Sequence, residues 1–223
     1  MLILDTSFAS DGVYTSPKGY LNTLFARTHA AGGLYVADEV QGGFGRLGQH
    51  FWGFQFDDAI PDIVTLGKPM GNGHPLAAVV TRPEIAETLA NESGYFNTFG
   101  GNPVSCAAGL AVLEVIEKEA LQHNALKVGQ YLKERLATLQ RDYPVIGGLH
   151  GSGLLLGIDI IKPDGTPDPE LAARITNHMR EKGVLIGTTG QNYATLKVRP
   201  PVVFQKEHAE ILLAAMTKAL DES

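Results

Sequence analysis

Short apolar runs separated by a helical segment limit the possible folds of this chain more than any other feature of its sequence. Residues 20–31 show helical spacing of apolar side chains and stop at Gly32-Gly33, which favours a helix end there. A strand, a helix and a strand at this spacing predict a βαβ unit in a mostly parallel sheet. The runs that we interpret as strands cover residues 1–5, 34–37, 63–66 and 77–81.

Two of the predicted strands end in charged residues. Asp38 directly follows the strand over 34–37, and Lys68 follows the strand over 63–66 after a single glycine, Gly67. Parallel sheets of this kind bind ligands at the carboxyl ends of their strands. The sequence therefore predicts that Asp38 and Lys68 lie where a ligand binds.

The pattern changes after residue 101, where a long helical segment begins at Asn102-Pro103. Helices and short strands then mix, which predicts a small α+β domain. We place the domain boundary inside the long helix, near residue 115. The predicted helices cover residues 102–120, 124–141, 169–182 and 206–220, and the predicted strands cover 153–160, 184–187 and 195–198.

Composition excludes several classes of protein. With 223 residues and 44% hydrophobic content, the chain is long enough for one large domain or two small ones. The net charge of −6 comes without a cluster of Lys or Arg, which argues against a nucleic-acid surface, and no apolar run reaches the roughly 18 residues of a membrane span. Cys106 is the single cysteine, so no intrachain disulfide forms and we expect a reducing, cytoplasmic location. No metal site is predicted.

Five short motifs follow one another in a fixed order. They are D-E-V-Q at 38–41, G-F-G-R at 43–46, P-D-I-V at 61–64, G-K-P-M-G-N-G at 67–73 and T-F-G-G-N-P at 98–103. Each motif is weak by itself. Together the series resembles the class III aminotransferases, which depend on pyridoxal 5′-phosphate (PLP), and the resemblance covers nearly the whole chain.

The resemblance implies the PLP-dependent transferase fold type I. Residues 1–115 would form the second half of the PLP-binding large domain, and residues 116–223 the small C-terminal domain. Lys68 would form the Schiff base with the cofactor and afterwards carry protons to and from the substrate carbon. The apolar segments on both sides of Lys68 predict that its stem is buried.

Four further residues are implied cofactor contacts in the first predicted domain. A buried carboxylate keeps the pyridine nitrogen of PLP protonated, and Asp38 is the candidate. Val40 would pack under the ring, and Gln41 would contact the ring hydroxyl. Thr98 resembles the threonine that hydrogen-bonds the cofactor phosphate of the neighbouring subunit, which implies a homodimer with shared sites.

The substrate side departs from the family pattern. Many members carry arginine three residues before a Pro-Pro pair, where it binds the substrate carboxylate, but this chain has Lys197 there and Arg199 directly before Pro200. A guanidinium grips an anion with two hydrogen bonds and an ammonium does not, so an α-amino acid is not assured as the substrate. Arg199, Lys197 and Arg46 are the candidate anion contacts. His150, where the family usually has arginine, is interpreted as a domain-hinge residue.

Three functions remain open. Residues 67–75 and 95–101 are most similar to the branch that contains alanine–glyoxylate aminotransferase 2-like proteins and phospho-lyases, so the reaction is either amino transfer or elimination of phosphate from a phosphorylated amine. Family members extend further on the N-terminal side and carry the loop that binds the cofactor phosphate there. We therefore expect a C-terminal half that is incomplete for activity. The third hypothesis is a non-catalytic remnant that serves as an interaction subunit.

Overall fold

The computed structural model describes residues 1–223, which form two compact units. The first unit contains residues 1–6, 16–44 and 52–120, and the second contains residues 7–15, 45–51 and 121–223. The helix in which we placed the domain boundary belongs to the first unit. The second unit also includes two short segments from the N-terminal part of the chain. A single domain boundary in the sequence does not describe this arrangement of segments.

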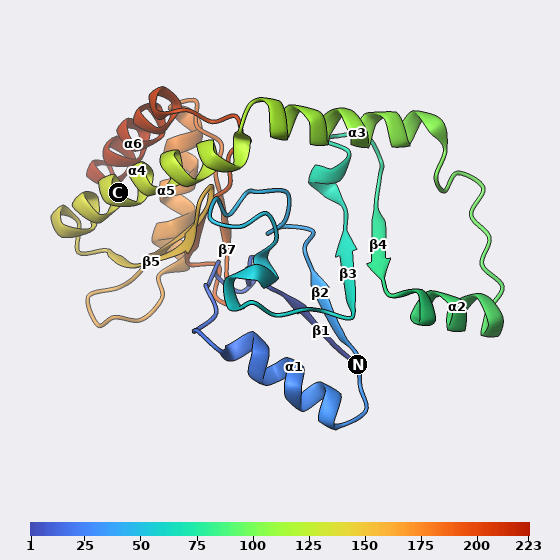
Figure 1. The fold of residues 1–223 in the computed structure, drawn as a ribbon. Helices are drawn as coiled ribbons and strands as arrows, with labels where there is room; N and C mark the ends of the chain where they lie inside the picture. Colours follow the sequence, from blue (N-terminus) through green and yellow to red (C-terminus); the bar gives the residue numbers. More distant parts are fainter. The chain divides into compact units, whose positions relative to one another are not determined.

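A four-stranded sheet forms the centre of the first unit (Figure 1). Its strands are β1 (Leu2–Asp5), β2 (Tyr35–Asp38), β3 (Ile63–Leu66) and β4 (Ala78–Thr81), in the order β1-β2-β3-β4. The first three strands are parallel, and β4 runs antiparallel to β3. The predicted mostly parallel α/β sheet is confirmed, and all four predicted strands are present.

Helices of the first unit connect these strands. The connection from β1 to β2 contains α1, whose Leu21 is fully buried and whose Phe25 contacts the ring of Tyr35 edge-on at 5.9 Å between ring centroids. The elements are α1 (Tyr20–Ala30), η1 (Gly53–Asp57), η2 (Lys68–Met70), α2 (Pro83–Glu92) and α3 (Pro103–Lys118). The predicted start of α3 is confirmed, because Asn102 Oδ1 accepts a hydrogen bond from Ser105 N at 3.0 Å and Pro103 is the first helical residue.

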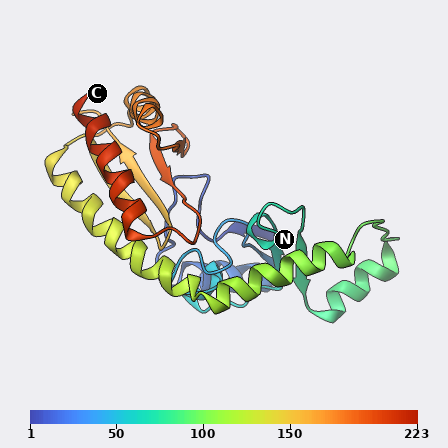
Figure 2. The same ribbon diagram turned by 90° about the horizontal axis from the view of Figure 1, so that it is seen from above.

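The second unit contains an antiparallel sheet covered by three helices. Its strands run in the order β5-β6-β8-β7. Figures 1 and 2 both show α4 and α6 side by side over this sheet. The elements are α4 (Leu121–Asp142), β5 (Ile146–Ser152), β6 (Leu155–Ile160), α5 (Pro169–Glu181), β7 (Gly187–Thr189), β8 (Thr195–Val198) and α6 (Lys206–Asp221).

Strand β5 was not predicted from the sequence. Its residues, I-G-G-L-H-G-S, include three glycines and lack the alternation of apolar and polar residues by which half-buried strands are identified. A strand was predicted over 153–160, but Gly153 (φ 55°) makes the turn between β5 and β6. The predicted small α+β domain is present with this additional strand.

The two faces of the second sheet are covered differently. Leu132, Ile158, Ile175 and Met179 are fully buried between one face and the helices. The other face is covered by residues 7–15, whose Ala9 carbonyl accepts hydrogen bonds from Lys197 Nζ at 2.8 Å and Thr189 Oγ1 at 3.0 Å. In the whole chain, no helix combines the length and the apolar character needed to cross a bilayer.

Candidate active site

Asp38 and Lys68 follow neighbouring parallel strands. Asp38 ends β2 and pairs with Thr65 of β3, three residues before Lys68. The ladder continues one step further, because Glu39 N donates to Thr65 O at 3.0 Å. Parallel strands end at the same edge of a sheet, so both residues lie at the carboxyl edge, where the sequence predicted a ligand site.

The loop after β2 holds the Asp38 carboxylate in place. Asp38 is half-buried, and its Oδ1 accepts a hydrogen bond from Val40 N at 3.0 Å. Val40 in turn lies beside the second loop, since a Cβ placed on Gly67 would lie 3.7 Å from Val40 Cγ2. The structure therefore brings Asp38, Val40 and the Gly67-Lys68 peptide together. Gln41 is half-buried in the turn that follows.

Lys68 stands in a strained turn. It is the first residue of η2 and has φ 36°, in the left-handed region that residues with a side chain rarely adopt. Backbone strain of this kind persists where the surroundings impose it, often at functional sites. The expectation of a buried stem is wrong, because Lys68 is exposed. Leu66 and Gly67 are buried, and the chain becomes exposed at Lys68.

Glu39, the neighbour of Asp38, was given no role from the sequence. It is fully buried, and burial raises the pKa of its carboxyl group despite opposing hydrogen bonds. Its Oε2 accepts from Gly53 N at 2.7 Å, and its Oε1 accepts from Phe54 N and Thr6 Oγ1, each at 2.9 Å. Glu39 therefore anchors the loop after β2 to η1 and to the end of β1, and so supports the position of Asp38.

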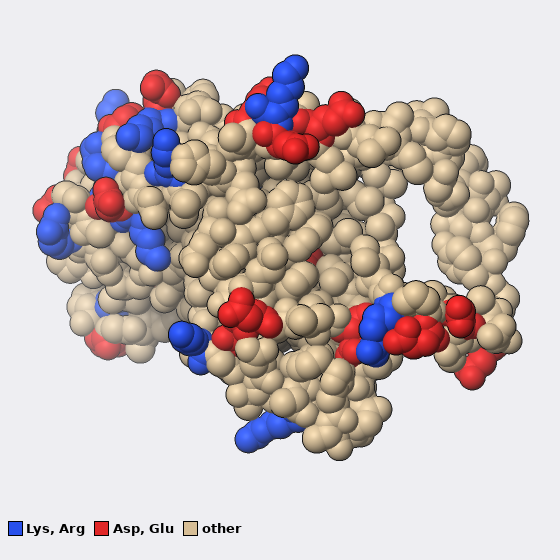
Figure 3. All heavy atoms as spheres, in the orientation of Figure 1, with Lys and Arg blue, Asp and Glu red and all other residues tan.

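Thr98 lies on an exposed segment between α2 and α3. The turn over residues 97–100 is held by Asn97, whose Oδ1 accepts from Phe99 N at 3.2 Å and Gly100 N at 2.9 Å. Phe96 and Phe99 are 88% and 78% exposed, and no charged residue occurs from residue 93 to residue 113. Figure 3 shows this part of the first unit as uncharged surface beside the charged residues of α2.

Arg46 has a structural role in the second unit. One guanidinium nitrogen, Nη1, donates to Leu154 O at 3.0 Å and to Pro200 O at 2.7 Å. Burial, together with the charge of Arg199, lowers the pKa of Arg46 to about 10. The guanidinium thus joins the start of β6 to the chain after β8, which is a different task from the anion contact considered for it.

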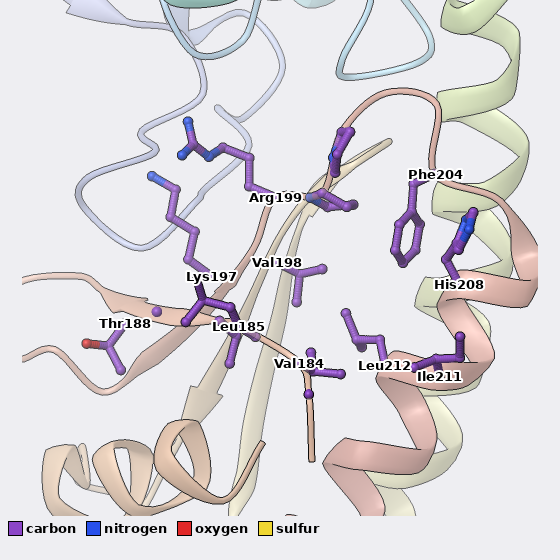
Figure 4. Close-up of a pocket in the computed structure, with 15 residues that line it drawn as sticks. Val184, Leu185, Thr188, Lys197, Val198, Arg199, Phe204, His208, Ile211 and Leu212 are labelled. Atoms are coloured by element: carbon purple, nitrogen blue, oxygen red, sulfur yellow. The ribbon is translucent and has the colours of Figure 1, made fainter. Parts of the chain in front are cut away.

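Lys197 and Arg199 line one end of a cavity of about 630 Å³ in the second unit. Figure 4 shows both side chains extending in the same direction, away from the apolar wall that includes Val184, Phe204 and Leu212. Arg199 is exposed, whereas Lys197 is half-buried and donates to Ala9 O. The two cations therefore project from the same end of β8, and only Arg199 is fully at the surface.

His150 is held within the second unit. Its Nε2 lies 2.6 Å from Asp159 Oδ2, while Thr195 Oγ1 donates to the other oxygen, Oδ1, at 2.7 Å. The ring of Tyr14 packs against His150 with 4.7 Å between ring centroids. These contacts tie β5, β6 and β8 to the covering segment 7–15.

Comparisons with known proteins identify the family. Residues 2–220 match the family model described as Aminotransferase class-III. Alanine–glyoxylate aminotransferase 2 homolog 2, mitochondrial, of Arabidopsis thaliana is 47% identical over 95% of this chain and 44% of its own length. The mitochondrial alanine–glyoxylate aminotransferase 2 of Homo sapiens is 42% identical over 95% of this chain and 42% of its own length. The resemblance inferred from the motifs is confirmed, and the chain spans about half the length of these relatives.

Solved structures agree with this assignment. A phospholyase from Arthrobacter in complex with phosphoethanolamine matches 99% of this chain and 53% of its own, with a TM-score of 0.96 and 44% identity. An amine transaminase from an uncultivated Pseudomonas species, in the PLP-bound internal aldimine form, matches 99% and 52%, with a TM-score of 0.89 and 32% identity. The predicted fold type and the predicted PLP dependence of the family are confirmed.

The prediction of a cytoplasmic location is contradicted. The relatives from Arabidopsis thaliana and Homo sapiens are both named as mitochondrial proteins. The prediction relied on the single cysteine, and a lack of disulfides does not distinguish one reducing compartment from another.

Proposed function

Because this chain belongs to the class III aminotransferase family, we propose that it carries the cofactor lysine of a PLP-dependent aminotransferase that moves an amino group between an amine or amino acid and a 2-oxo acid. The observation that carries the proposal is the placement of Asp38 and Lys68 at the ends of adjacent parallel strands. A carboxylate, an amine and an apolar side chain follow the ends of neighbouring strands, and they are groups that suit the ring and the aldehyde carbon of PLP.

Each of these residues has a role in holding the cofactor. Asp38 holds a proton at the pyridine nitrogen, and its carboxylate is oriented by Val40 N. Val40 would pack against the ring, and Gln41 would contact the ring hydroxyl. Lys68 Nζ would be the amine that holds the cofactor covalently.

The bound cofactor supplies a protonated ring that accepts the electrons released when a bond to the substrate carbon breaks. Lys68 supplies the proton transfer. Its amine would be the base that removes and returns the proton of the substrate carbon. The left-handed turn fixes the backbone of Lys68, and the buried Glu39 beside Asp38 anchors the loop that carries the carboxylate.

We further propose a homodimer in which Thr98 contacts the cofactor phosphate bound by the partner subunit. The exposed, uncharged segment around Thr98 supports the proposal, because large apolar side chains left in water are typical of protein interfaces. Replacement of Phe96 by Glu tests it by sedimentation. The wild type is expected as a dimer and the variant as a monomer, and a monomeric wild type would remove the proposal.

Lys197 and Arg199 are the proposed contacts to an anionic group of the substrate. A phospho-lyase acting on a phosphorylated amine is the second candidate, supported by lysine at position 197 and by the likeness to a phospholyase solved with phosphoethanolamine. The products decide between the two reactions. An aminotransferase forms an amino acid from a 2-oxo acid, whereas a phospho-lyase releases inorganic phosphate from phosphoethanolamine.

The experiment that tests the proposed function is borohydride reduction of the chain loaded with PLP, followed by peptide mapping. We expect the pyridoxyl label on the peptide that contains Lys68. Lys68→Ala should abolish the label, and Lys118→Ala, a change at an exposed lysine of α3, should not affect it.

A label on any lysine other than Lys68 would refute the assignment of the cofactor lysine. An unlabelled wild type would mean that this chain does not form the cofactor site by itself, which is expected both of an incomplete half and of an interaction subunit without catalysis.

A further inference from the structure

Three polar side chains form a hydrogen-bonded chain between the Lys68 turn and the start of α3. His74 Nε2 lies 2.7 Å from Ser105 Oγ, and Asn102 Nδ2 lies 2.8 Å from the same oxygen. Ser105 is buried, with 6% of its surface exposed. A buried hydroxyl thus joins two segments that are 31 residues apart in the sequence.

Hydrogen-bond roles in this network are determined by its geometry. A backbone N–H only donates, so the 3.0 Å bond from Ser105 N fixes the oxygen of the Asn102 side chain, Oδ1, as its acceptor. Asn102 Nδ2 must then donate, and it has two acceptors, Ser105 Oγ and Phe99 O, both at 2.8 Å. Ser105 Oγ keeps its own hydrogen and a second lone pair for His74. The bond to His74 therefore forms whether the ring nitrogen accepts or donates.

His74 is a structural part of the turn that carries Lys68. His74 N donates to Gly71 O at 3.0 Å, and Met70 N donates to Gly67 O at 3.0 Å. A Cβ on Gly71 would lie 2.1 Å from His74 O, so these two residues are in close backbone contact. Displacement of His74 therefore displaces the whole turn over residues 67–74.

The same turn packs against α3. A Cβ on Gly109 of α3 would lie 3.8 Å from Met70 O and 2.7 Å from Leu76 Cδ2, so the helix approaches the turn closely at this glycine. Figure 1 shows α3 passing close to the chain between β3 and β4. The hydrogen bonds of His74 and Ser105 thus lie where the turn and the helix are already in contact.

The network also reaches the segment of Thr98. Asn102 holds the carbonyl of Phe99, the residue after Thr98, while Asn97 holds the amide of Phe99. The turn over residues 97–100 is therefore fixed to α3 on one side of the network, and the turn over residues 67–74 on the other.

We infer that His74, Ser105 and Asn102 are positioning residues that fix the Lys68 turn and the Thr98 turn to the start of α3. Their contacts are with the two turns, and they act through them. The consequence for catalysis depends on the proposed function, because it requires that Lys68 is the cofactor lysine.

The test compares variants that break or preserve the His74–Ser105 bond. Ser105→Ala and His74→Leu remove it, and His74→Gln keeps a side-chain nitrogen near the position of Nε2. His123→Leu, at an exposed histidine of α4, is the matched control. Backbone hydrogen–deuterium exchange of residues 68–74 and 97–101 is measured without cofactor, and the rate of borohydride-trapped labelling of Lys68 is measured with PLP.

Loss of one hydrogen bond should accelerate exchange in both turns and slow labelling, each by about threefold to tenfold. His74→Gln should stay within about twofold of the wild type, and His123→Leu should be unchanged. Unchanged exchange of residues 68–74 in Ser105→Ala, or equal impairment in His74→Gln and His74→Leu, would overturn the inference. Absence of label from the wild type would count against the proposed function alone, because the exchange comparison still decides the network.

Discussion

The two units of the protein differ in how they bury large apolar side chains, because most of the fully buried ones lie in the second unit. In the second unit, Leu132, Ile158 and Met179 are fully buried between the antiparallel sheet and its helices. In the first unit, Val80 is 55%, Phe96 is 88% and Leu110 is 60% exposed. Burial of apolar surface is the main stabilising term in folding, so the second unit has a closed core, whereas the first leaves surface that a partner can cover.

The first unit also relies on buried carboxylates. Glu39, Asp57 and Asp62 are all buried and accept hydrogen bonds from backbone amides. The candidate active-site residues Asp38 and Lys68 are in this unit. The unit that contains these candidate residues thus combines a smaller apolar core with buried carboxylates that accept backbone hydrogen bonds.

The largest predicted effect tests the difference in apolar burial. Leu132→Ala in the second unit should lower the free energy of unfolding by about 2–5 kcal/mol, because it leaves a cavity in a closed core. Leu110→Ala in the first unit should change it by less than about 0.5 kcal/mol, because the side chain is already in water. Urea unfolding of both variants measures these changes. Equal losses of unfolding free energy would show that the packing around these two side chains does not differ.

The next effect tests the role of buried carboxylates. Glu39→Ala should lower the free energy of unfolding by about 2–3 kcal/mol, because Gly53 N, Phe54 N and Thr6 Oγ1 lose their acceptor. Glu84→Ala, at an exposed glutamate of α2, is the control. Both are measured by urea unfolding at neutral pH. A Glu39 variant as stable as the control would mean that water replaces the lost contacts.

Asp62 gives a prediction that depends on pH. Burial acts to raise its pKa, but the hydrogen bond from Tyr35 N and the contacts with His29 and Arg82 outweigh burial, so the pKa lies below its usual value. A lowered carboxyl pKa adds stability above the unfolded value of about 3.9, and this stability is lost as the pH falls through the native value. Asp62→Asn should therefore destabilise by about 1–2 kcal/mol at pH 7 and by progressively less below about pH 4.

Unfolding measured from pH 7 down to acid checks this dependence. Asp58→Asn, at an exposed neighbouring aspartate, should show no such trend. If the loss of unfolding free energy in Asp62→Asn stayed constant with pH, the negative charge of Asp62 would contribute no stability beyond that of the side chain's shape.

The smallest predicted effect is a gain in stability at the candidate site. Lys68→Gly should raise the free energy of unfolding by about 1 kcal/mol, because glycine adopts φ 36° without strain, while it removes the labelled amine. Lys68→Ala removes the amine without the gain in stability, because alanine keeps a Cβ and therefore the strain at this φ. Thermal unfolding of the two variants distinguishes them, and equal midpoints would show that the turn is unstrained.

Much of the first unit could be predicted because its signals are local. Apolar runs gave all four strands, and Asn102-Pro103 gave the start of α3. The placement of Asp38 and Lys68 at strand ends follows from the same runs. Their chemical roles, and those of Val40, Gln41, Thr98, Lys197 and Arg199, stay predictions.

The errors and omissions concern contacts between distant residues. The glycines of β5 gave no strand signal, because β6 and not the side-chain pattern stabilises that strand. No pattern near Arg46 indicates that its partners are Leu154 O and Pro200 O, which are 108 and 154 residues away. Segment 7–15 has a loop composition in the sequence, and contacts across almost the whole chain make it part of the second unit.

The sequence by itself determined the family, the parallel strands and the positions of Asp38 and Lys68, because apolar spacing, helix caps and motif order are written in neighbouring residues. Only the tertiary structure determined which polar groups form hydrogen bonds with one another. Glu39 anchors η1, Ser105 joins His74 to Asn102, and Lys197 binds the carbonyl of Ala9. Hydrogen bonds require partners at about 3 Å, and only the folded chain brings residues that are far apart in sequence to that distance.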